Sequence, residues 1–256
     1  MLRTIFIYAL ITAIATGVGA LPFAFKKHFS PTQQAIAQAI AAALMITASF
    51  GMIYEWLHFT EHGLSSITLW LSRSARGVVG GILLGLVFIL FADKIISKRD
   101  DLSLGQLSTA DTKKVLLIVG IMTLHSFAEG VAIGVSFEPA LSFGVFIALA
   151  MAIHNIPEWL AISSVMTSKG IPRRKAGLWS IFSSLPQPLM AIPAFLFVEH
   201  FSVFLPVGLG FAAGAMLRMC FSELIPDALE GAPASTIATI ATIAITLMIM
   251  FQQMLQ

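Results

Sequence analysis

The sequence predicts an all-α integral membrane protein. Of its 256 residues, 57% are hydrophobic and only 11% are charged, whereas soluble domains carry about 25% charged residues. The mean hydropathy of the chain is +0.90. The sequence lacks the residue-by-residue alternation that is typical of strands in a membrane barrel, and we therefore expect a bundle of helices.

Eight apolar segments divide the chain. A helix needs about 20 apolar residues to cross the hydrocarbon core of a bilayer. By that measure residues 1–256 form a single transmembrane domain with eight spanning helices, over residues 2–25, 33–57, 77–97, 114–137, 142–167, 176–198, 203–226 and 234–254. We interpret the first segment as a spanning helix and not as a signal peptide, because no polar mature domain or clear cleavage pattern follows it. Several glycines suit close packing between these helices: Gly80, Gly81, Gly85, Gly210 and Gly214.

The loops differ in charge. Those after the first, third and fifth segments hold 11 of the 15 Lys and Arg residues, namely Lys26, Lys27, Lys94, Lys98, Arg99, Lys113, Lys114, Lys169, Arg173, Arg174 and Lys175. The positive-inside rule places these loops in the cytoplasm and so predicts extracytoplasmic N- and C-termini.

Without a clear transit peptide, we expect a multi-pass protein of the cell inner (plasma) membrane. The lipid bilayer is its expected partner, and the net charge of +2 gives no reason to expect nucleic acid.

Two six-residue stretches near the middle of neighbouring apolar segments resemble each other. They read HSFAEG at residues 125–130 and HNIPEW at residues 154–159. An ionisable side chain at the bilayer centre costs roughly 2.5–3.5 kcal/mol, so such residues usually face the bundle interior and mark an ion path. The sequence therefore indicates a buried polar site formed by the fourth and fifth segments.

The spacing within each stretch suits metal binding. His and Glu four residues apart share a helical face, so His125 with Glu129 and His154 with Glu158 can each bind one ion. The short turn at residues 137–142 predicts that the two helices run antiparallel. Two imidazoles and two carboxylates suit Zn²⁺, with Fe²⁺, Mn²⁺, Co²⁺ and Cd²⁺ as alternatives. Buried ion pairs that only join two helices are the alternative interpretation.

At these residues the chain resembles the ZIP (Zrt/Irt-like) divalent-metal transporters, nearest their bacterial GufA-like branch. That branch typically shows HNFPEG in its fourth helix and a similar NIPEG stretch in its fifth. The resemblance also covers residues 42–55, 81–94 and 211–227. It implies a ZIP-like bundle of eight helices, often a homodimer, that moves Zn²⁺ or similar ions toward the cytoplasm. The metal is then the substrate, and we expect no cofactor.

The resemblance also implies particular ligands. The residues that match the family's first metal position are Met45, His125, Glu129, His154 and Glu158. The residues at its second position are Ser126, Asn155 and Gln187, where Ser126 replaces an Asn and Gln187 replaces the Glu of a Glu-Pro pair. Because a neutral amide binds a dication more weakly than a carboxylate does, we predict one strong metal site and a weak or absent second one.

Two further residues depart from the family. Trp159 replaces a Gly, and its ring must alter the packing or narrow the ion path. Arg218 lies in the seventh segment, where it needs a counter-charge from Glu223 or from a site carboxylate. An arginine that reached the site would repel a dication.

Other polar residues mark the two ends of a possible path. Candidates for metal capture at the entrance are Glu55, His58, Glu61 and His62, for which a solvated polar loop is the alternative. Candidates for the exit are Glu223 and Asp227, for which ordinary helix-end carboxylates are the alternative.

These observations favour a divalent-metal transporter that works by alternating access around a mid-membrane site, and not an enzyme. One alternative is an intramembrane zinc metallo-hydrolase, in which two His and one Glu hold a zinc ion that activates water. The sequence contains no His-Glu-x-x-His motif to support it. The other alternative is a non-transporting relative in which Trp159, Arg218 and Gln187 have closed the path.

Overall fold

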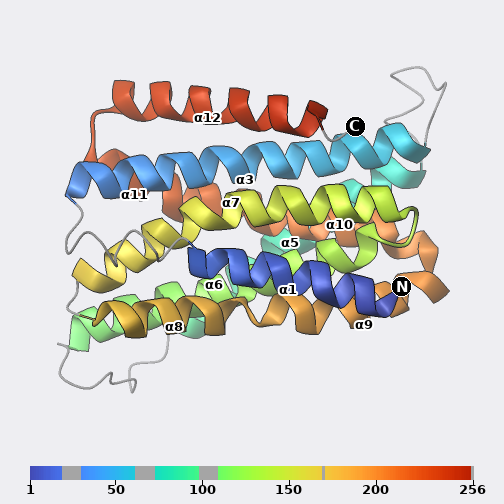
Figure 1. The fold of residues 1–256 in the computed structure, drawn as a ribbon, viewed down its shortest axis with the longest axis horizontal. Helices are drawn as coiled ribbons and strands as arrows, with labels where there is room; N and C mark the ends of the chain where they lie inside the picture. Colours follow the sequence, from blue (N-terminus) through green and yellow to red (C-terminus); the bar gives the residue numbers. More distant parts are fainter. Residues whose placement is uncertain (19–29, 61–72, 98–108, 169–170, 255–256) are drawn as a thin grey trace.

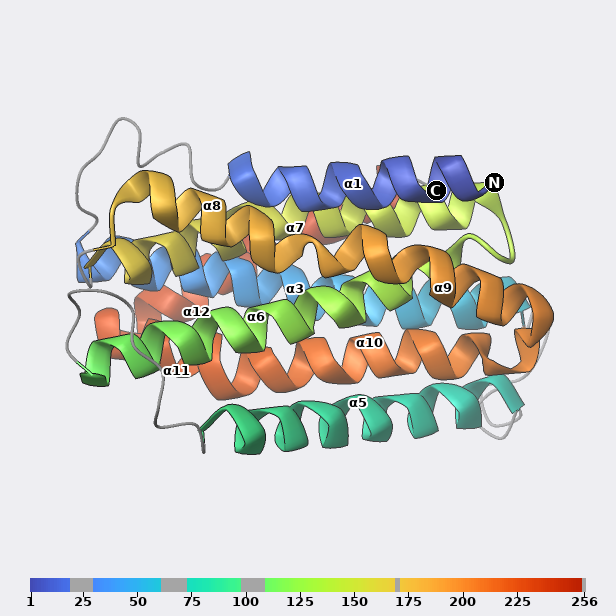
Figure 2. The same cartoon turned by 90° about the horizontal axis from the view of Figure 1, so that it is seen from below.

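A computed structural model describes residues 1–18, 30–60, 73–97, 109–168 and 171–254. Over these residues the chain is helical and forms no strand. The elements are α1 (Leu2–Val18), α3 (Pro31–Thr60), α5 (Arg73–Ser97), α6 (Thr109–Ser136), α7 (Leu141–Ser168), α8 (Arg173–Ser184), α9 (Pro186–His200), η1 (Ser202–Phe204), α10 (Leu205–Met219), η2 (Cys220–Leu224), α11 (Ile225–Gly231) and α12 (Ala234–Met254). The long helices lie roughly along the longest axis of an elongated bundle, with both termini near the same end (Figures 1 and 2).

Each of the eight predicted segments contains helix. Five stretches are long and apolar enough to cross a membrane: Pro31–Tyr54, Ser74–Phe91, Arg174–His200, Leu205–Gly231 and Ala234–Met254. The apolar stretches of the other three helices are shorter within the described residues: Leu2–Gly17, Ser126–Ser136 and Leu141–Ile153. The prediction of an all-helical membrane bundle is confirmed, and the number of crossings stays a prediction.

The sixth predicted segment is interrupted, contrary to the expectation of one continuous helix over residues 176–198. The helix α8 ends at Ser184, and α9 begins at Pro186. Prolines at 186 and 188 supply no backbone N–H and crowd the preceding turn. At the joint, the N–H of Leu185 instead donates to the carbonyl of Phe182 at 3.2 Å. The break places Gln187 in the first turn of a new helix.

The seventh predicted segment also changes its helical type. Between α10 and α11 the chain forms the π-helical turn η2, closed by a bond from the N–H of Ile225 to the carbonyl of Cys220. Such turns insert one extra residue into a helix and are often found at functional sites. The helical path then runs on to Gly231, beyond the predicted end at residue 226.

Glycines bring α5 and α10 together. A Cβ atom at Gly85 would lie 2.1 Å from the carbonyl oxygen of Phe211, and one at Gly214 would lie 2.2 Å from that of Ile82. The described glycines in this contact are Gly77, Gly81, Gly85, Gly210 and Gly214, and the prediction of close packing is confirmed for the last four, which are the ones it named. It is wrong for Gly80, because a Cβ there would have nothing within 4 Å.

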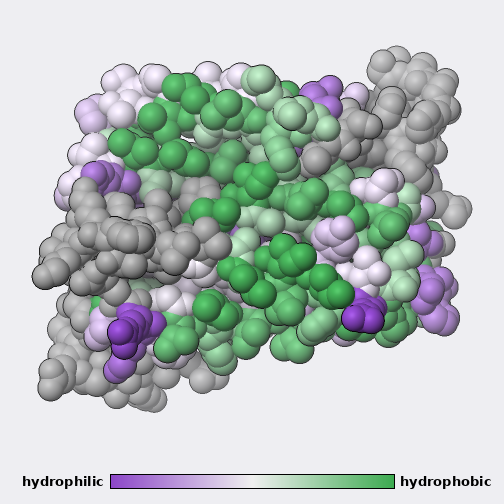
Figure 3. Space-filling model, in the orientation of Figure 1, coloured by the Kyte–Doolittle hydropathy of each residue, from purple (hydrophilic) through white to green (hydrophobic). Residues whose placement is uncertain are grey.

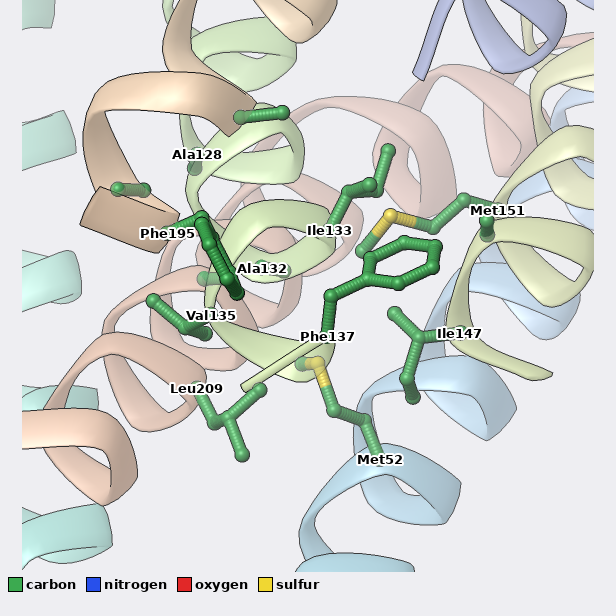
Figure 4. Packing of buried hydrophobic residues seen from close by; sticks show 14 of the residues in the cluster. Met52, Ala128, Ala132, Ile133, Val135, Phe137, Ile147, Met151, Phe195 and Leu209 are labelled. Atoms are coloured by element: carbon green, nitrogen blue, oxygen red, sulfur yellow. The ribbon is translucent and has the colours of Figure 1, made fainter. Parts of the chain in front are cut away.

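The largest apolar cluster fixes the connection between α6 and α7. Phe137, in the turn between these helices, lies among Ile133, Ile147 and Met151 (Figure 4). Its ring packs so closely on Gly144 that a Cβ there would lie 2.3 Å from the ring. Burial of this ring holds the beginning of α7 against the end of α6.

The outside of the bundle is apolar. Exposed large hydrophobic residues include Leu83, Val87 and Phe91 of α5 and Leu247 and Met250 of α12. In the face drawn in Figure 3, hydrophobic residues fill much of the middle, and the strongly hydrophilic ones lie mainly toward the two ends. A surface of this kind suits a lipid environment, where apolar side chains face the hydrocarbon.

Candidate metal site

The two stretches singled out in the sequence lie on neighbouring antiparallel helices. Residues 125–130 belong to α6 and residues 154–159 to α7, and these helices pack against each other. The turn that joins them is short: the N–H of Phe137 donates to the carbonyl of Gly134 at 3.4 Å, and α7 begins at Leu141. The predicted antiparallel arrangement is confirmed.

Glu129 is a buried carboxylate. Its exposed fraction is 1%, and Nε2 of Gln187 donates a hydrogen bond to its Oε2. Gln187 is itself fully buried, in the first turn of α9. A buried carboxylate is costly unless hydrogen-bond donors compensate for lost water. The break between α8 and α9 therefore delivers a neutral donor to Glu129, the one predicted His or Glu ligand in α6 and α7 whose side chain is described.

The glycine after Glu129 makes this contact possible. A Cβ at Gly130 would lie 2.6 Å from the carbonyl oxygen of Gln187, so a larger residue there would push α9 away. One turn further, a Cβ at Gly134 would lie 2.2 Å from the carbonyl oxygen of Ala191. The close contact of α6 with α9 thus begins beside the Glu129 carboxylate.

The helix α1 adds a residue that the sequence analysis missed. Thr12 is fully buried, and its Oγ1 lies 2.8 Å from Oε1 of Gln187. Asn155 of α7, also buried, donates from Nδ2 to the main-chain carbonyl of Thr12 at 3.3 Å. A threonine within an apolar helix is the only signal of this role in the sequence. Thr12, Gln187, Glu129 and Asn155 form what we call the polar network.

Besides Glu129 and Met45, three predicted ligands of the first position are placed only by their helices. His125 lies in α6, and His154 and Glu158 lie in α7, but their side chains are outside the described part of the structure. Among the described side chains, no group of three or more His, Cys, Asp and Glu residues is arranged to hold a metal ion. Coordination by these three residues stays a prediction.

Met45 and Trp159 lie together in a second apolar cluster. Both are fully buried, and this cluster also contains Met216 and Met219 of α10. Trp159 is the largest of the fully buried side chains described, so its ring is part of the packing between helices. Whether it also narrows an ion path, and whether Met45 binds metal, stay predictions.

The remaining predicted residues fall at separate places. Ser126 is buried in α6. Glu55 and His58 lie near the end of α3 with side chains outside the described residues, and Glu61 and His62 lie outside them altogether. At the opposite end of α3, Asp227 of α11 accepts a hydrogen bond from Nε2 of the buried Gln38 at 3.2 Å.

Arg218 lies at the end of α10, directly before the π-helical turn that contains Glu223, and both side chains are partly buried. The predicted pairing of their charges stays a prediction.

One carboxyl near the α6–α7 turn titrates abnormally. Burial raises the pKa of Glu138 above its ordinary value, and the negative charge of Glu199 raises it further. Glu138 lies in the turn after α6, and Glu199 is in the last turn of α9. Glu138 is therefore protonated more readily than an ordinary glutamate.

The fold and the site define a class of protein. It is a helical membrane protein with a carboxylate and several amide and hydroxyl groups buried between helices α1, α6, α7 and α9, as transporters of ions and polar solutes have. The family model described as ZIP zinc transporter matches residues 97–196, which include both stretches and Gln187.

Comparison with known proteins agrees with this family assignment. A predicted zinc transporter of Arabidopsis thaliana is 44% identical over 96% of the chain, which spans 38% of that relative's length. The zinc transporter GufA of Myxococcus xanthus is 30% identical over 87% of each protein. The zinc transporter ZupT of Corynebacterium aurimucosum is 27% identical over 88% of the chain and 87% of its own length. The chain belongs to the ZIP zinc transporter family, and its resemblance to the GufA-like branch is confirmed.

Proposed function

We propose that this chain carries divalent metal ions across a membrane through a site formed by His125, Glu129, His154 and Glu158. The observation that carries the proposal is the buried Glu129 carboxylate, which lies in the predicted motif at the meeting point of α6 and α9. The chain's family, and the names of its relatives as zinc transporters, support Zn²⁺ as the first substrate to test.

Chemically, two imidazole nitrogens and two carboxylates replace the water shell of the ion in mid-membrane. Zn²⁺ accepts this mixed set readily, and Fe²⁺, Mn²⁺, Co²⁺ and Cd²⁺ are the competing ions. These ligands bind metal only when they are deprotonated, so protonation of a His or Glu ligand lowers the affinity and helps to release the ion.

We propose that one ion binds strongly and that the second position is weak or absent. The amide of Gln187 presents its N–H to Glu129, and an N–H group cannot bind a cation. Ser126 and Asn155 supply neutral oxygen atoms. The set at the second position therefore offers no carboxylate beyond those of the first.

We propose further features for this carrier. It crosses the plasma membrane eight times with both termini on the extracytoplasmic side, forms a homodimer, and transports metal toward the cytoplasm by alternating access. The common end of both termini in Figures 1 and 2 agrees with an even number of crossings. The loops with most Lys and Arg then face the cytoplasm. In this proposal α6 and α7 move relative to a scaffold of the other helices, which includes α5 and α10.

The test is metal influx into proteoliposomes that contain a fluorescent metal indicator. Wild-type protein is compared with Glu158→Ala, and with Glu230→Ala as a control carboxylate that is exposed in α11. We expect saturable Zn²⁺ influx that Glu158→Ala abolishes and Glu230→Ala preserves, and competition with the other ions then ranks the substrates. Folded protein that binds Zn²⁺ without any influx would contradict the carrier and favour the non-transporting relative. Cleavage of lipid or peptide would favour the metallo-hydrolase.

A further inference from the structure

Thr12 connects α1 to both helices that carry the predicted ligands. Its hydroxyl reaches Gln187, which in turn holds Glu129 of α6, and its main-chain carbonyl accepts a hydrogen bond from Asn155, the neighbour of His154 in α7. The described members of this chain of contacts, Thr12, Gln187, Glu129 and Asn155, have exposed fractions of 1% or less. One residue of α1 is thus joined to both halves of the site.

The chemistry of these groups fixes the direction of the hydrogen bonds. An ionised carboxylate only accepts, so Gln187 must turn its Nε2 toward Glu129 and its Oε1 toward Thr12. Oε1 also only accepts, and the Thr12 hydroxyl must therefore donate to it. The hydroxyl has a second acceptor 2.7 Å away, the carbonyl of Ala9. A hydroxyl has one proton, so the carbonyl of Ala9 and Oε1 of Gln187 share the proton of Thr12, and the bond to Gln187 is the one that leaves the helix.

From this chain of contacts we infer that Thr12 is a positioning residue for metal binding. It fixes the orientation of the Gln187 amide, and the amide fixes the carboxylate of Glu129 in the geometry that receives the ion. The inference rests on the proposed function, since it assigns a role to α1 at the same site. Gln187, which stands where the family has a Glu ligand, then has a role of its own, because it donates the hydrogen bond that orients the ligand Glu129.

The expected size of the effect follows from the number of bonds between each residue and the ion. Removing a group that hydrogen-bonds directly to a metal ligand typically lowers metal affinity 10- to 100-fold. Thr12 acts one bond further away, through a single neutral hydrogen bond. We expect its loss to weaken binding by roughly three- to tenfold.

The chain offers a matched control one helical turn away. Thr16 is also fully buried in α1, but its hydroxyl bonds to the carbonyl of Ala13 in its own helix. Valine replaces threonine at nearly constant volume, so Thr12→Val and Thr16→Val remove the same group from equally buried positions. Thr12→Ser keeps the hydroxyl, and Gln187→Met removes the amide that Thr12 is proposed to orient.

The experiment measures the Kd of Zn²⁺ for the full-length protein in detergent by calorimetry, with thermal melting of the metal-free protein as the check of folding. Thr12→Val should raise the Kd by roughly three- to tenfold, while Thr16→Val and Thr12→Ser stay within about twofold of wild type. In the Gln187→Met background, Thr12→Val should add no further change, because the amide is no longer there to be oriented.

Equal Kd values for Thr12→Val and Thr16→Val would overturn the inference, as would effects of Thr12→Val and Gln187→Met that simply add. These constants come from binding and not from flux. A protein that binds Zn²⁺ without transporting it would therefore contradict the proposed carrier and still decide the role of Thr12. Wild-type protein that binds no Zn²⁺ would overturn both proposals.

Discussion

The contact of α5 with α10 and the contact of α6 with α9 both depend on close packing at glycine residues, but they serve different purposes. Both bring two backbones together at glycine: in the first pair a Cβ at Gly85 would lie 2.1 Å from a facing carbonyl oxygen, and in the second a Cβ at Gly134 would lie 2.2 Å from one. In the first pair both helices contribute glycines. In the second pair the glycines lie on α6, and α9 presents a broken, proline-rich start.

The difference lies in what the close approach brings together. Around Gly85 and Gly214, backbone packs against backbone, which suits a rigid contact between membrane helices. Around Gly130, the approach brings the Gln187 amide to the Glu129 carboxylate. The same packing therefore gives support in one region and a polar site in the other.

The largest effect on stability is expected in the α5–α10 contact. Gly85→Ala places a methyl group where the carbonyl oxygen of Phe211 lies, so the helices must separate. We expect a loss of about 1–3 kcal/mol, measured as a lower melting temperature in detergent. Gly80→Ala is the control, because its methyl group meets open space and alanine favours helix by about 1 kcal/mol. Equal melting of both variants would remove the distinction between these glycines.

A smaller change in stability, but a larger one in metal binding, is expected in the α6–α9 contact. Gly130→Ala pushes the start of α9 away from Glu129, so we expect Zn²⁺ affinity to fall by about tenfold or more. Gly134→Ala disturbs the same pair of helices one turn away from the carboxylate. It should lower the melting temperature while leaving the Kd within about twofold of wild type. If both variants changed the Kd equally, the polar site would not depend on the position of the glycine.

The smallest expected effect on stability concerns Glu138, in the turn after α6. Because burial and Glu199 raise the pKa of Glu138, the folded protein binds its proton more tightly than the unfolded chain does. Stability is therefore lost as the pH rises from the ordinary value of 4.5 through the raised pKa. At pH 7 the Glu138→Gln variant should have a higher melting temperature than wild type. The gain in the free energy of unfolding is at most about 1 kcal/mol, because solvent screens a partly exposed carboxylate. The two proteins should converge below pH 4.5.

Melting curves across pH test this prediction, with Glu199→Gln as a second variant that removes only the charge contribution. That variant should shift stability in the same direction by a smaller amount. A difference between Glu138→Gln and wild type that grows as the pH falls would contradict the assignment.

The sequence was sufficient for the broad fold, since apolar length alone located helix in each of the eight segments. It was less successful where side chains from distant segments meet. The sixth segment was predicted as one helix from its apolar length, in spite of the prolines at 186 and 188, and the break before Gln187 was missed. Gly80 and Gly81 look alike in the sequence, because which of them faces α10 depends on how α5 is rotated in the bundle.

The site shows the same limit. The paired motifs indicated Glu129, and the family resemblance drew attention to Gln187 and Asn155. Neither could reveal that Gln187 donates to Glu129, because that requires the position of α9 beside Gly130. Thr12 was missed because a threonine in an apolar helix usually bonds to its own backbone, as Thr16 does.

The interruption at Leu185 also has a mechanical consequence. A continuous helix transmits a push along its whole length, whereas a joint with missing hydrogen bonds lets its two sides tilt separately. On one side, α8 is tied to α7 through the hydroxyl groups of Ser163 and Ser180, 3.1 Å apart. On the other side, α9 follows the glycines of α6. A displacement of Gln187 therefore acts first on α6, and it reaches α8 only through the joint or through the contacts of α8 with α6.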